Sequence, residues 1–359
     1  MGGGIIGLSS AYQLMQRGCD VAIVDPEPGR GAAWVAAGML TPGSEAHFGE
    51  ERAVRLFQAG LDTWEDFARE LGGPEQNSVG FERCGTLEVA VDASDRVQLE
   101  QSVLLQRSLD IDVIEKHIDE AEVIEPALSP HIGGLFSVAQ DARVDPRRVL
   151  QCLLDALRQG GARFVASEAV SVALSGGGVA VTLENGTKLE SSTIVCTLGS
   201  WTNRVAGLER GPKVRPVKGH VLRLFGPPLL THTIRATTRG RSVYLVQRPE
   251  GELVVGATVE EMGFDTTLQA GQIRQLLNDA QSVVSGIEEL ELREVSAGLR
   301  PALEGLTPIV DWLEPEKILI ATGHYRNGVL LAPLTSLAVT GMVLGDPYPS
   351  ASLFGSIND

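Results

Sequence analysis

The chain has 359 residues, of which 43% are hydrophobic and 21% are charged, proportions typical of globular proteins with two domains or one large domain. Its net charge of −16 argues against nucleic acid or an anionic membrane surface as a partner. The 4 cysteines are scattered and no secretion signal is recognisable, which favours a reducing cytoplasm. The 6 histidines lack metal-ligand spacing, so we expect no metal site.

Residues 2–25 carry a nucleotide-binding pattern. Gly2, Gly4 and Gly7 form G-x-G-x-x-G, an apolar stretch with helical spacing follows, and the run 21–24 ends on Asp25. Such glycines allow a tight turn, and the next helix offers unpaired N–H groups to a pyrophosphate. An acid at the position of Asp25 typically binds a ribose hydroxyl. An ordinary glycine-rich turn is the alternative, but the helix, strand and acid together favour a nucleotide.

The strand that normally precedes this pattern is not in the sequence, because only Met1 stands before Gly2. That strand would lie in the centre of a parallel sheet, and its neighbours would lose their hydrogen-bond partner without it. We expect a start site assigned too late, or a shortened sequence, rather than a fold that lacks the strand. A weakened nucleotide site is the remaining alternative.

Residues 29–40 are small and rich in glycine and alanine, which favours close approach of the backbone to a ligand over a flexible loop. Apolar residues then recur at helical spacing from 50 to 71, and Gly72, Gly73 and Pro74 are expected to end that helix. A strand is predicted at 85–90, and helical stretches are predicted from there to about residue 128.

Asp145 and Pro146 predict the start of a helix, as an N-cap followed by proline at the first position. Short strands are predicted at 163–166, 169–174 and 179–183, with Asn185 and Gly186 as a hairpin turn. Residues 193–198 form an apolar run typical of a buried parallel strand. This run leads into Gly199, at the end of the strand where such sheets bind ligands.

From residue 216 the pattern indicates antiparallel strands at 218–224, 242–247 and 253–257, covered by a helix at 268–284. An apolar strand at 317–321 leads into G-H-Y-R-N-G at 323–328 and then into an uncharged stretch, 328–345. That stretch is at the lower limit of length for a membrane span, but Pro333 and several hydroxyl residues interrupt it. We therefore expect a buried helix.

Two arginines stand apart from the other charged residues. Arg300 lies in a G-L-R-P segment and Arg326 lies between the last strand and the apolar helix, each flanked by glycine or apolar residues. Two such arginines near a nucleotide site suggest carboxylate binding, because a guanidinium holds a carboxylate through two parallel hydrogen bonds. A surface position or a structural ion pair is the alternative for either one alone.

Several segments combine into a family resemblance: G-x-G-x-x-G at 2–7, A-A-G-M-L at 36–40, V-K-G at 217–219, V-G-A-T-V-E at 255–260, G-L-R-P at 298–301 and G-H-Y-R-N-G at 323–328. With them the sequence resembles the glycine oxidases of thiamine biosynthesis, in the D-amino-acid oxidase class of FAD enzymes. The second and the last segment are specific to the glycine oxidase branch, whereas many enzymes share the first.

The resemblance implies an α/β fold: a Rossmann-like FAD-binding domain, discontinuous in sequence and without its first strand, and an antiparallel-sheet α+β substrate domain. The FAD-binding domain is expected at 1–78, 140–212 and 291–359, and the substrate domain at 79–139 and 213–290. The flavin is expected to be noncovalent, because no cysteine follows Cys196 to attach it as in sarcosine oxidases.

Site residues follow from the resemblance motif by motif. Arg326 is expected to hold the substrate carboxylate, with Arg300 as a second contact or an orienting group, and the two roles are exchangeable. Tyr244 is expected to close the pocket, although a half-buried strand aromatic is the alternative. The expected FAD contacts are Gly2, Gly4, Ile5, Ile6, Gly7, Asp25, Ala32, Ala33, Ala37, Gly38, Met39, Val170, Gly199, His324, Tyr325, Arg326, Asn327, Gly328, Val329 and Leu330.

The implied reaction is the oxidation of glycine, sarcosine or a small D-amino acid by oxygen, giving an imine and hydrogen peroxide; the imine gives glyoxylate and ammonia. No side chain is expected to act as the catalytic base, because the flavin takes the hydride. The imine would feed thiazole formation, with thiazole synthase as a partner of a homo-oligomer. Gln247, Ser242 and Val259 depart from the family pattern and leave the exact substrate open. A related FAD dehydrogenase with another acceptor and a flavin-free binding protein are the alternatives.

Overall fold

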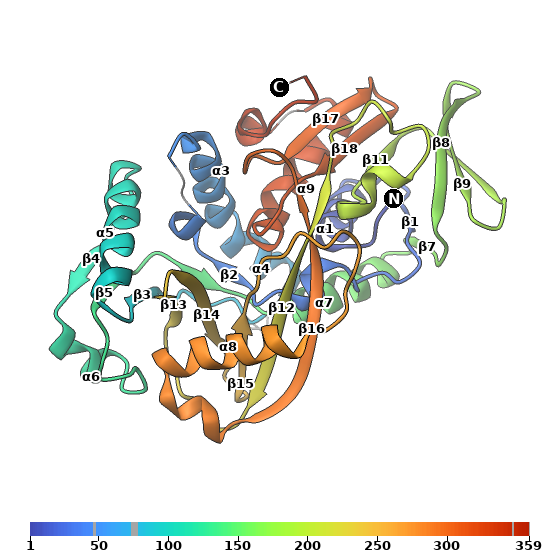
Figure 1. Cartoon of the computed structure of the whole chain (residues 1–359). Coiled ribbons are helices and arrows are strands. Elements are labelled where there is room, and N and C mark those ends of the chain that lie inside the picture. The colour runs from blue at the N-terminus through green and yellow to red at the C-terminus, as the bar shows by residue number, and fades with distance from the viewer. Residues whose placement is uncertain (46–47, 73–77, 347, 359) are drawn as a thin grey trace.

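Short strands form two small sheets in the half of the molecule that contains both chain ends, here called the terminal half (Figure 1). The structure is a computed structural model and describes residues 1–45, 48–72, 78–346 and 348–358. β1 (Ala22–Val24) pairs in parallel with β7 (Arg163–Val165), and β11 (Ile194–Cys196) pairs in parallel with β18 (Ile318–Thr322), which also pairs with β17 (Ile309–Glu314). The predicted strands at 163–166, 193–198 and 317–321 are thereby confirmed.

Met1 and Gly2 lie between these two sheets. The amino group of Met1 donates to the carbonyl of Val195 (2.8 Å), and the N–H of Gly2 donates to the carbonyl of Val24 (2.9 Å). Among the described residues no strand pairs with both β1 and β11, as the sequence pattern predicted. The glycine-rich turn therefore lies at the carboxyl ends of β1 and β11, which is where parallel sheets bind ligands.

Helices surround the two sheets: α1 (Ile5–Gln16), α2 (Ala32–Val35), α3 (Glu51–Asp62), α4 (Trp64–Gly72), α7 (Pro146–Gln159) and α9 (Gly328–Leu344). Their apolar faces meet in a shared core. α7 begins as predicted, because the Asp145 carboxylate accepts hydrogen bonds from the N–H groups of Arg147 and Arg148. α9 is buried along most of its length, as expected, and no helix in the described ranges is long and apolar enough to cross a membrane.

The single helix predicted from 50 to 71 is instead two helices, because the chain breaks between α3 and α4. The hydroxyl of Thr63 donates to the carbonyl of Gly60 (2.7 Å) at the end of α3. The next residue, Trp64, is fully buried, and its Nε1 donates to the carbonyl of Leu330 in α9 (2.9 Å). A contact with a distant helix thus fixes this break, while the predicted stop at Gly73 and Pro74 falls outside the described residues.

The second half of the molecule is built on an eight-stranded sheet and is here called the sheet half (Figure 1). In spatial order its strands are β16 (Glu291–Ala302), β12 (Arg215–Phe225), β15 (Glu252–Gly256), β14 (Arg241–Gln247), β13 (Thr233–Thr238), β3 (Thr86–Ala90), β5 (Gly134–Val138) and β4 (Ile114–Lys116). All neighbours are antiparallel except β3 and β13. The predicted strands at 85–90, 218–224, 242–247 and 253–257 are confirmed.

α8 (Ala270–Val283) covers this sheet as predicted, and α5 (Ala93–Ser108) and α6 (Ala121–Ile124) lie near β3, β4 and β5 (Figure 1). The hairpins β8 (Ala169–Ser175), β9 (Gly178–Leu183) and β10 (Lys188–Ser191) form a separate sheet, with the predicted turn at Gly186 (φ +80°). β2 (Met39–Leu40) pairs with β6 (Ala142–Arg143). β16, which falls in the range expected for the FAD-binding domain, is bonded along β12 of the sheet half. The domain boundaries stay predictions.

Candidate active site

A cavity of about 900 Å³ is lined by residues of both halves. Gly2, Gly4 and Asp25 of the terminal half line it, and so do Tyr244 and Arg300 of the sheet half. Ligand and cofactor sites typically have volumes of roughly 300–1,000 Å³, so this one suits a large ligand. The structure therefore places the predicted nucleotide residues and the predicted carboxylate residues around one cavity.

The glycine-rich pattern forms the turn that precedes α1. Gly2 has φ +95°, a conformation that L side chains rarely adopt, and Gly4 is the N-cap of the helix. A Cβ on Gly7 would lie 1.9 Å from the carbonyl oxygen of Gly2, so only glycine lets α1 pack this closely on the turn. The first N–H groups of α1 thus begin at the cavity wall, where they would stabilise an anion.

Asp25 follows β1 directly and also lines the cavity. Its Oδ2 accepts from the N–H of Gly3 (2.7 Å) and its Oδ1 accepts from the N–H of Glu27 (2.8 Å). These two bonds fix the orientation of the carboxylate. A carboxylate has about four acceptor positions, so lone pairs remain for the hydroxyl groups of a ribose.

The small-residue segment, defined as residues 32–39, forms another part of the wall. Ala32, Ala33, Ala37, Gly38 and Met39, which the resemblance implies as FAD contacts, all line the cavity. Gly38 has φ +80°, and a Cβ there would lie 2.0 Å from the carbonyl oxygen of Val144. With methyl groups or hydrogens in place of most side chains, the backbone of this segment can come into contact with a ligand.

The loop after β18 brings His324, Tyr325 and Asn327 to the same cavity, and Gly328 and Val329 at the start of α9 also line it. His324 is 3% exposed and its Nε2 lies 3.0 Å from the Oγ1 of Thr335. Burial lowers the pKa of this imidazole to about 3, so it is neutral at physiological pH. The start of α9 adds a second set of helix N–H groups, which favours negative charge at this wall.

Arg300 projects from β16 and is half-buried. Its Nη1 donates to the carbonyls of Thr258 (3.0 Å) and Lys218 (3.3 Å). A Cβ on Gly219 would lie 2.2 Å from its Nη2, so glycine on the neighbouring strand makes room for the guanidinium. The side chain is therefore held in a defined position at the cavity wall.

Further bonds hold the peptide that accepts from Arg300. The Oγ1 of Thr258 accepts from the N–H of His220 (2.8 Å) and donates to Oε1 of Glu260 (2.6 Å). That same Oε1 lies 2.8 Å from Nδ1 of His220, which is fully buried. Thr258 and Glu260 belong to the V-G-A-T-V-E motif and His220 follows V-K-G, but neither pattern indicated that these residues hold the peptide that accepts from Arg300.

Tyr244 lies on β14 and also lines the cavity. Gly256 is its cross-strand partner on β15, and a Cβ there would lie 2.2 Å from the Tyr244 hydroxyl oxygen. The ring therefore lies over the glycine, which leaves room for it on the neighbouring strand.

Arg326 occupies a different environment from Arg300. It is exposed and lines the cavity from the loop after β18, with its guanidinium carbon 5.0 Å from the ring centroid of Tyr325. Tyr325 itself has φ +47°, so the loop turns sharply at this point. Both arginines thus face one cavity, Arg300 from a strand and Arg326 from a loop.

Three residues expected to contact FAD do not line the cavity. Val170 is 41% exposed on β8, and Glu168 and Ala169 form the wall in its place. Leu330 is 1% exposed in the core, and Gly7 contacts the turn rather than the cavity, as described above. Ile5, Ile6 and Gly199, which were also expected to contact FAD, do line the cavity. On β8, neighbouring side chains point to opposite faces, so Ala169 lines the cavity and Val170 does not. The FAD contacts themselves stay predictions.

A profile of the family described as FAD dependent oxidoreductase (DAO) matches residues 1–342. The chain belongs to this family. Glycine oxidase of Bacillus licheniformis is 31% identical over 357 residues, which cover 97% of this chain and 92% of that protein. The bifunctional protein ThiO/ThiG of a Nostoc species is 27% identical, over 96% of this chain but 52% of that protein. The crystal structure of glycine oxidase from Geobacillus kaustophilus superposes with a TM-score of 0.88 at 28% identity, covering 97% of this chain and 94% of that one.

This FAD-dependent oxidoreductase has a cavity that fits its cofactor. The glycine-rich turn and the start of α1 offer N–H groups to a pyrophosphate, and Asp25 offers a carboxylate to a ribose. The small-residue segment and residues 324–329 provide an uncrowded wall for a flat ring system. The cysteines are free thiols, and no described cysteine lines the cavity. Noncovalent attachment of the flavin stays a prediction. Among the described residues no cluster could hold a metal ion.

Proposed function

We propose that this oxidoreductase oxidises glycine, and to a lesser extent sarcosine or a small D-amino acid, with oxygen as the acceptor. The products would be the imine, which water converts to glyoxylate and ammonia, and hydrogen peroxide. The observation that carries the proposal is that Arg300 and Arg326 line the same cavity as the FAD-binding segments. The similarity to two glycine oxidases supports the same assignment.

In this proposal Arg300 and Arg326 bind the substrate carboxylate. Arg300 is already oriented by two backbone carbonyls, so little conformational entropy is lost when it binds. Arg326 would add a second guanidinium from the loop side, and Tyr244 would cover the substrate. A carboxylate held from these positions leaves the α-carbon and the amine of a small amino acid free to face the cofactor.

Bound FAD supplies the redox chemistry, because it accepts the hydride from the α-carbon and passes the electrons to oxygen. The protein's part is to bind the amino acid with its amine uncharged, so that the nitrogen lone pair can assist departure of the hydride. Under this proposal the reaction requires no side chain that acts as a base.

The resemblance to glycine oxidases of thiamine biosynthesis suggests that thiazole synthase consumes the imine. The bifunctional ThiO/ThiG relative is consistent with such a coupling, since this chain covers only 52% of it. Partnership with thiazole synthase and assembly as a homo-oligomer both stay predictions.

The test is peroxide release in air, measured for glycine, sarcosine, D-alanine and a bulky D-amino acid, after a visible spectrum has established that the purified protein carries flavin. We expect glycine to give the highest kcat/KM. Activity confined to the bulky D-amino acid would overturn the glycine assignment. Turnover that needs an added electron acceptor would identify a dehydrogenase instead, and a full-length protein without a flavin band would refute the enzyme assignment.

A further inference from the structure

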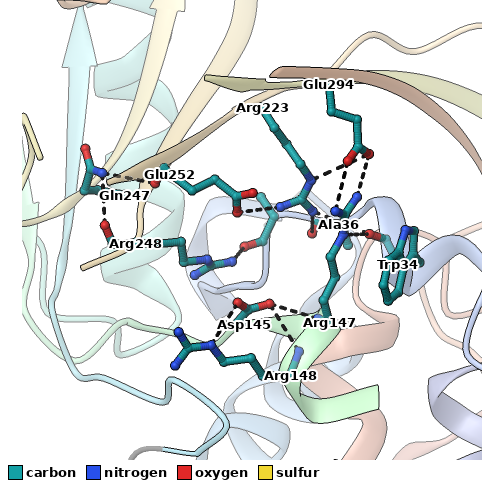
Figure 2. Close-up of polar contacts among 11 residues, drawn as sticks. Trp34, Ala36, Asp145, Arg147, Arg148, Arg223, Gln247, Arg248, Glu252 and Glu294 are labelled. Carbon is teal, nitrogen blue, oxygen red and sulfur yellow. Dashed lines mark hydrogen bonds and ion pairs between the residues drawn. The ribbon is translucent and has the colours of Figure 1, made fainter. Parts of the chain in front are cut away.

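Four arginines gather beside the small-residue segment without lining the cavity (Figure 2). This arginine cluster consists of Arg147 and Arg148 at the start of α7, Arg223 on β12, and Arg248 in the turn between β14 and β15. Arg223 and Arg248 are 2% and 4% exposed. Cations are rarely buried this deeply unless they are paired, so the cluster requires an explanation.

Three of the four donate to backbone carbonyls of the small-residue segment. Arg147 Nε donates to the carbonyl of Trp34 (3.0 Å), and Arg223 Nη2 lies 3.4 Å from the carbonyls of both Trp34 and Ala36. Arg248 Nη2 donates to the carbonyl of Ala37. The carbonyl of Gly38 accepts from the N–H of Val144 (2.9 Å). The carbonyls of residues 36, 37 and 38 are therefore all held by groups outside the cavity.

Carboxylates of the sheet half orient two of these guanidinium groups. Glu294 on β16 accepts two bonds from Arg147 (2.6 and 3.0 Å), and Glu252 on β15 accepts from Nη1 of Arg223 (2.7 Å). Figure 2 shows these pairs on one side of the segment, with Asp145 and Arg148 below them. The sheet half thus fixes the position of a segment that belongs to the terminal half.

Arg248 differs from the others, because two of its three nitrogens, Nε and Nη1, have no hydrogen-bond partner among the described residues. Burial lowers the pKa of this guanidinium to about 10. Gln247 holds the adjacent backbone, since its Nε2 donates to the carbonyls of Arg248 and Glu252 (3.0 Å each). A hydrogen-bonded side chain thus fixes this turn.

The geometry of the peptide group connects this cluster to the cavity. In a trans peptide the C=O and the following N–H point in opposite directions. Because the carbonyls of Ala36 and Ala37 point to the arginines, the N–H groups of Ala37 and Gly38 point to the opposite side. Ala37 and Gly38 line the cavity, so these N–H groups lie on the side of the segment away from the arginines, where a cofactor could accept from them. A hydrogen bond from a cation to a carbonyl also polarises the N–H of the same peptide.

We propose that Arg248 and Arg223 are positioning residues, which orient and polarise the peptides of residues 36–38 so that their N–H groups bind electron-rich atoms of the flavin. Reduction adds negative charge to the flavin, so these donors stabilise the reduced form more than the oxidised form. The inference requires bound FAD but not the proposed substrate. Its test therefore gives an answer whichever amine is oxidised.

The test uses the full chain, stripped of flavin and titrated with FAD, followed by measurement of the midpoint potential of the reconstituted protein. Arg248→Met is expected to weaken FAD binding at least tenfold and to lower the midpoint potential. The melting temperature of the flavin-free chain should stay the same or rise, because a buried cation without a carboxylate partner costs stability. Arg248→Lys should recover part of the affinity and of the potential, since it keeps the charge but not the planar donor group.

Arg148→Met is the matched control, because Arg148 lies in the same cluster but pairs with Asp145 and Glu250 rather than with the segment. It should leave FAD affinity and potential unchanged. FAD affinity and potential at the wild-type values in Arg248→Met would overturn the proposal. The proposal would also be overturned if flavin-free Arg248→Met has a lower melting temperature but the wild-type midpoint potential, because Arg248 would then have only a structural role. If Arg248→Met does not fold, the potential of Arg248→Lys decides, and a wild-type value there refutes the proposal.

Discussion

At one end of the cavity the chain presents mainly backbone, and at the other end it presents side chains on a rigid sheet. The nucleotide end consists of Gly2, Gly4 and the first turn of α1, and Asp25 is oriented there by two backbone N–H groups. The end to which we assign the substrate, here called the substrate end, contains Arg300 and Tyr244, each lying over a glycine of a neighbouring strand. A backbone site can be altered only by changing the path of the main chain, whereas a side-chain site can be removed by truncation. Variants at the two ends should therefore fail in different ways.

The largest effect is expected from Arg300→Ala. A substrate carboxylate would lose a pre-oriented guanidinium, which typically costs ~2–5 kcal/mol, or roughly 30-fold to several thousand-fold. We expect this loss in kcat/KM for glycine, with FAD affinity unchanged, measured by peroxide release and by flavin titration. An amine substrate without a carboxylate serves as the control and should be hardly affected. A few-fold change for glycine would place the carboxylate site elsewhere.

Gly219→Ala should damage the same end without removing any functional group. The new Cβ would lie 2.2 Å from Arg300 Nη2 and displace the guanidinium. Overpacking of this kind costs ~1–3 kcal/mol, so kcat/KM for glycine should fall by up to roughly 5- to 160-fold. Gly271→Ala in α8 is the matched control, because no atom lies within 4 Å of a Cβ at that position. Equal kinetics for the two variants would show that the position of Arg300 is not critical.

Gly7→Ala should affect the nucleotide end instead. Its Cβ would lie 1.9 Å from the carbonyl oxygen of Gly2, so the turn must move away from α1. We expect FAD affinity to fall about tenfold, corresponding to ~1.4 kcal/mol, while the KM of the flavin-saturated enzyme for glycine changes little. Flavin fluorescence titration and steady-state kinetics measure the two quantities. A variant that loses glycine affinity but keeps FAD affinity would contradict the division between the two ends.

Arg326→Ala should have a smaller effect than Arg300→Ala, because Arg326 is exposed and solvent weakens its interactions. We expect the KM for glycine to rise several-fold, corresponding to ~1 kcal/mol, with the flavin spectrum unchanged. Arg326→Lys should recover part of this. If Arg326→Ala proves the more damaging of the two, the roles of the two arginines are exchanged, and Arg326 is the principal carboxylate ligand.

The smallest effect concerns stability and pH. The pKa of His324 is about 3 in the folded protein, against an ordinary value of about 6.5 in the unfolded chain. As the pH falls, the imidazole therefore takes up a proton in the unfolded chain before it does so in the folded protein. The free energy of unfolding consequently decreases as the pH drops from 6.5 toward 3. Between pH 6.5 and 5.5 this group should contribute a loss of about 1 kcal/mol in the free energy of unfolding. Urea unfolding of the wild type and of His324→Gln at both pH values measures this loss. The same fall in the free energy of unfolding for both proteins would refute the assignment.

Much of the terminal half could be predicted from the sequence because its signals are local. The spacing of Gly2, Gly4 and Gly7, the cap formed by Asp145 and Pro146, and the uncharged run of α9 each act within a few residues or turns. The family motifs likewise identified the segments that line the cavity. They did not resolve which residue of a segment faces it, and for this reason Val170 and Leu330 were placed at the cavity without lining it.

The sequence by itself determined many of the helices and strands, the glycine-rich turn and the two arginines that could bind a carboxylate. Only the tertiary structure decided that Gly219 and Gly256 lie beneath Arg300 and Tyr244, and that Arg223 and Arg248 hold the carbonyls of the small-residue segment. Strand periodicity repeats every two residues and says nothing about which residue lies opposite on the neighbouring strand. The sequence likewise does not distinguish a buried arginine from an exposed one. Its role depends on carbonyls that lie about 200 positions away in the chain and become neighbours only when both halves fold together.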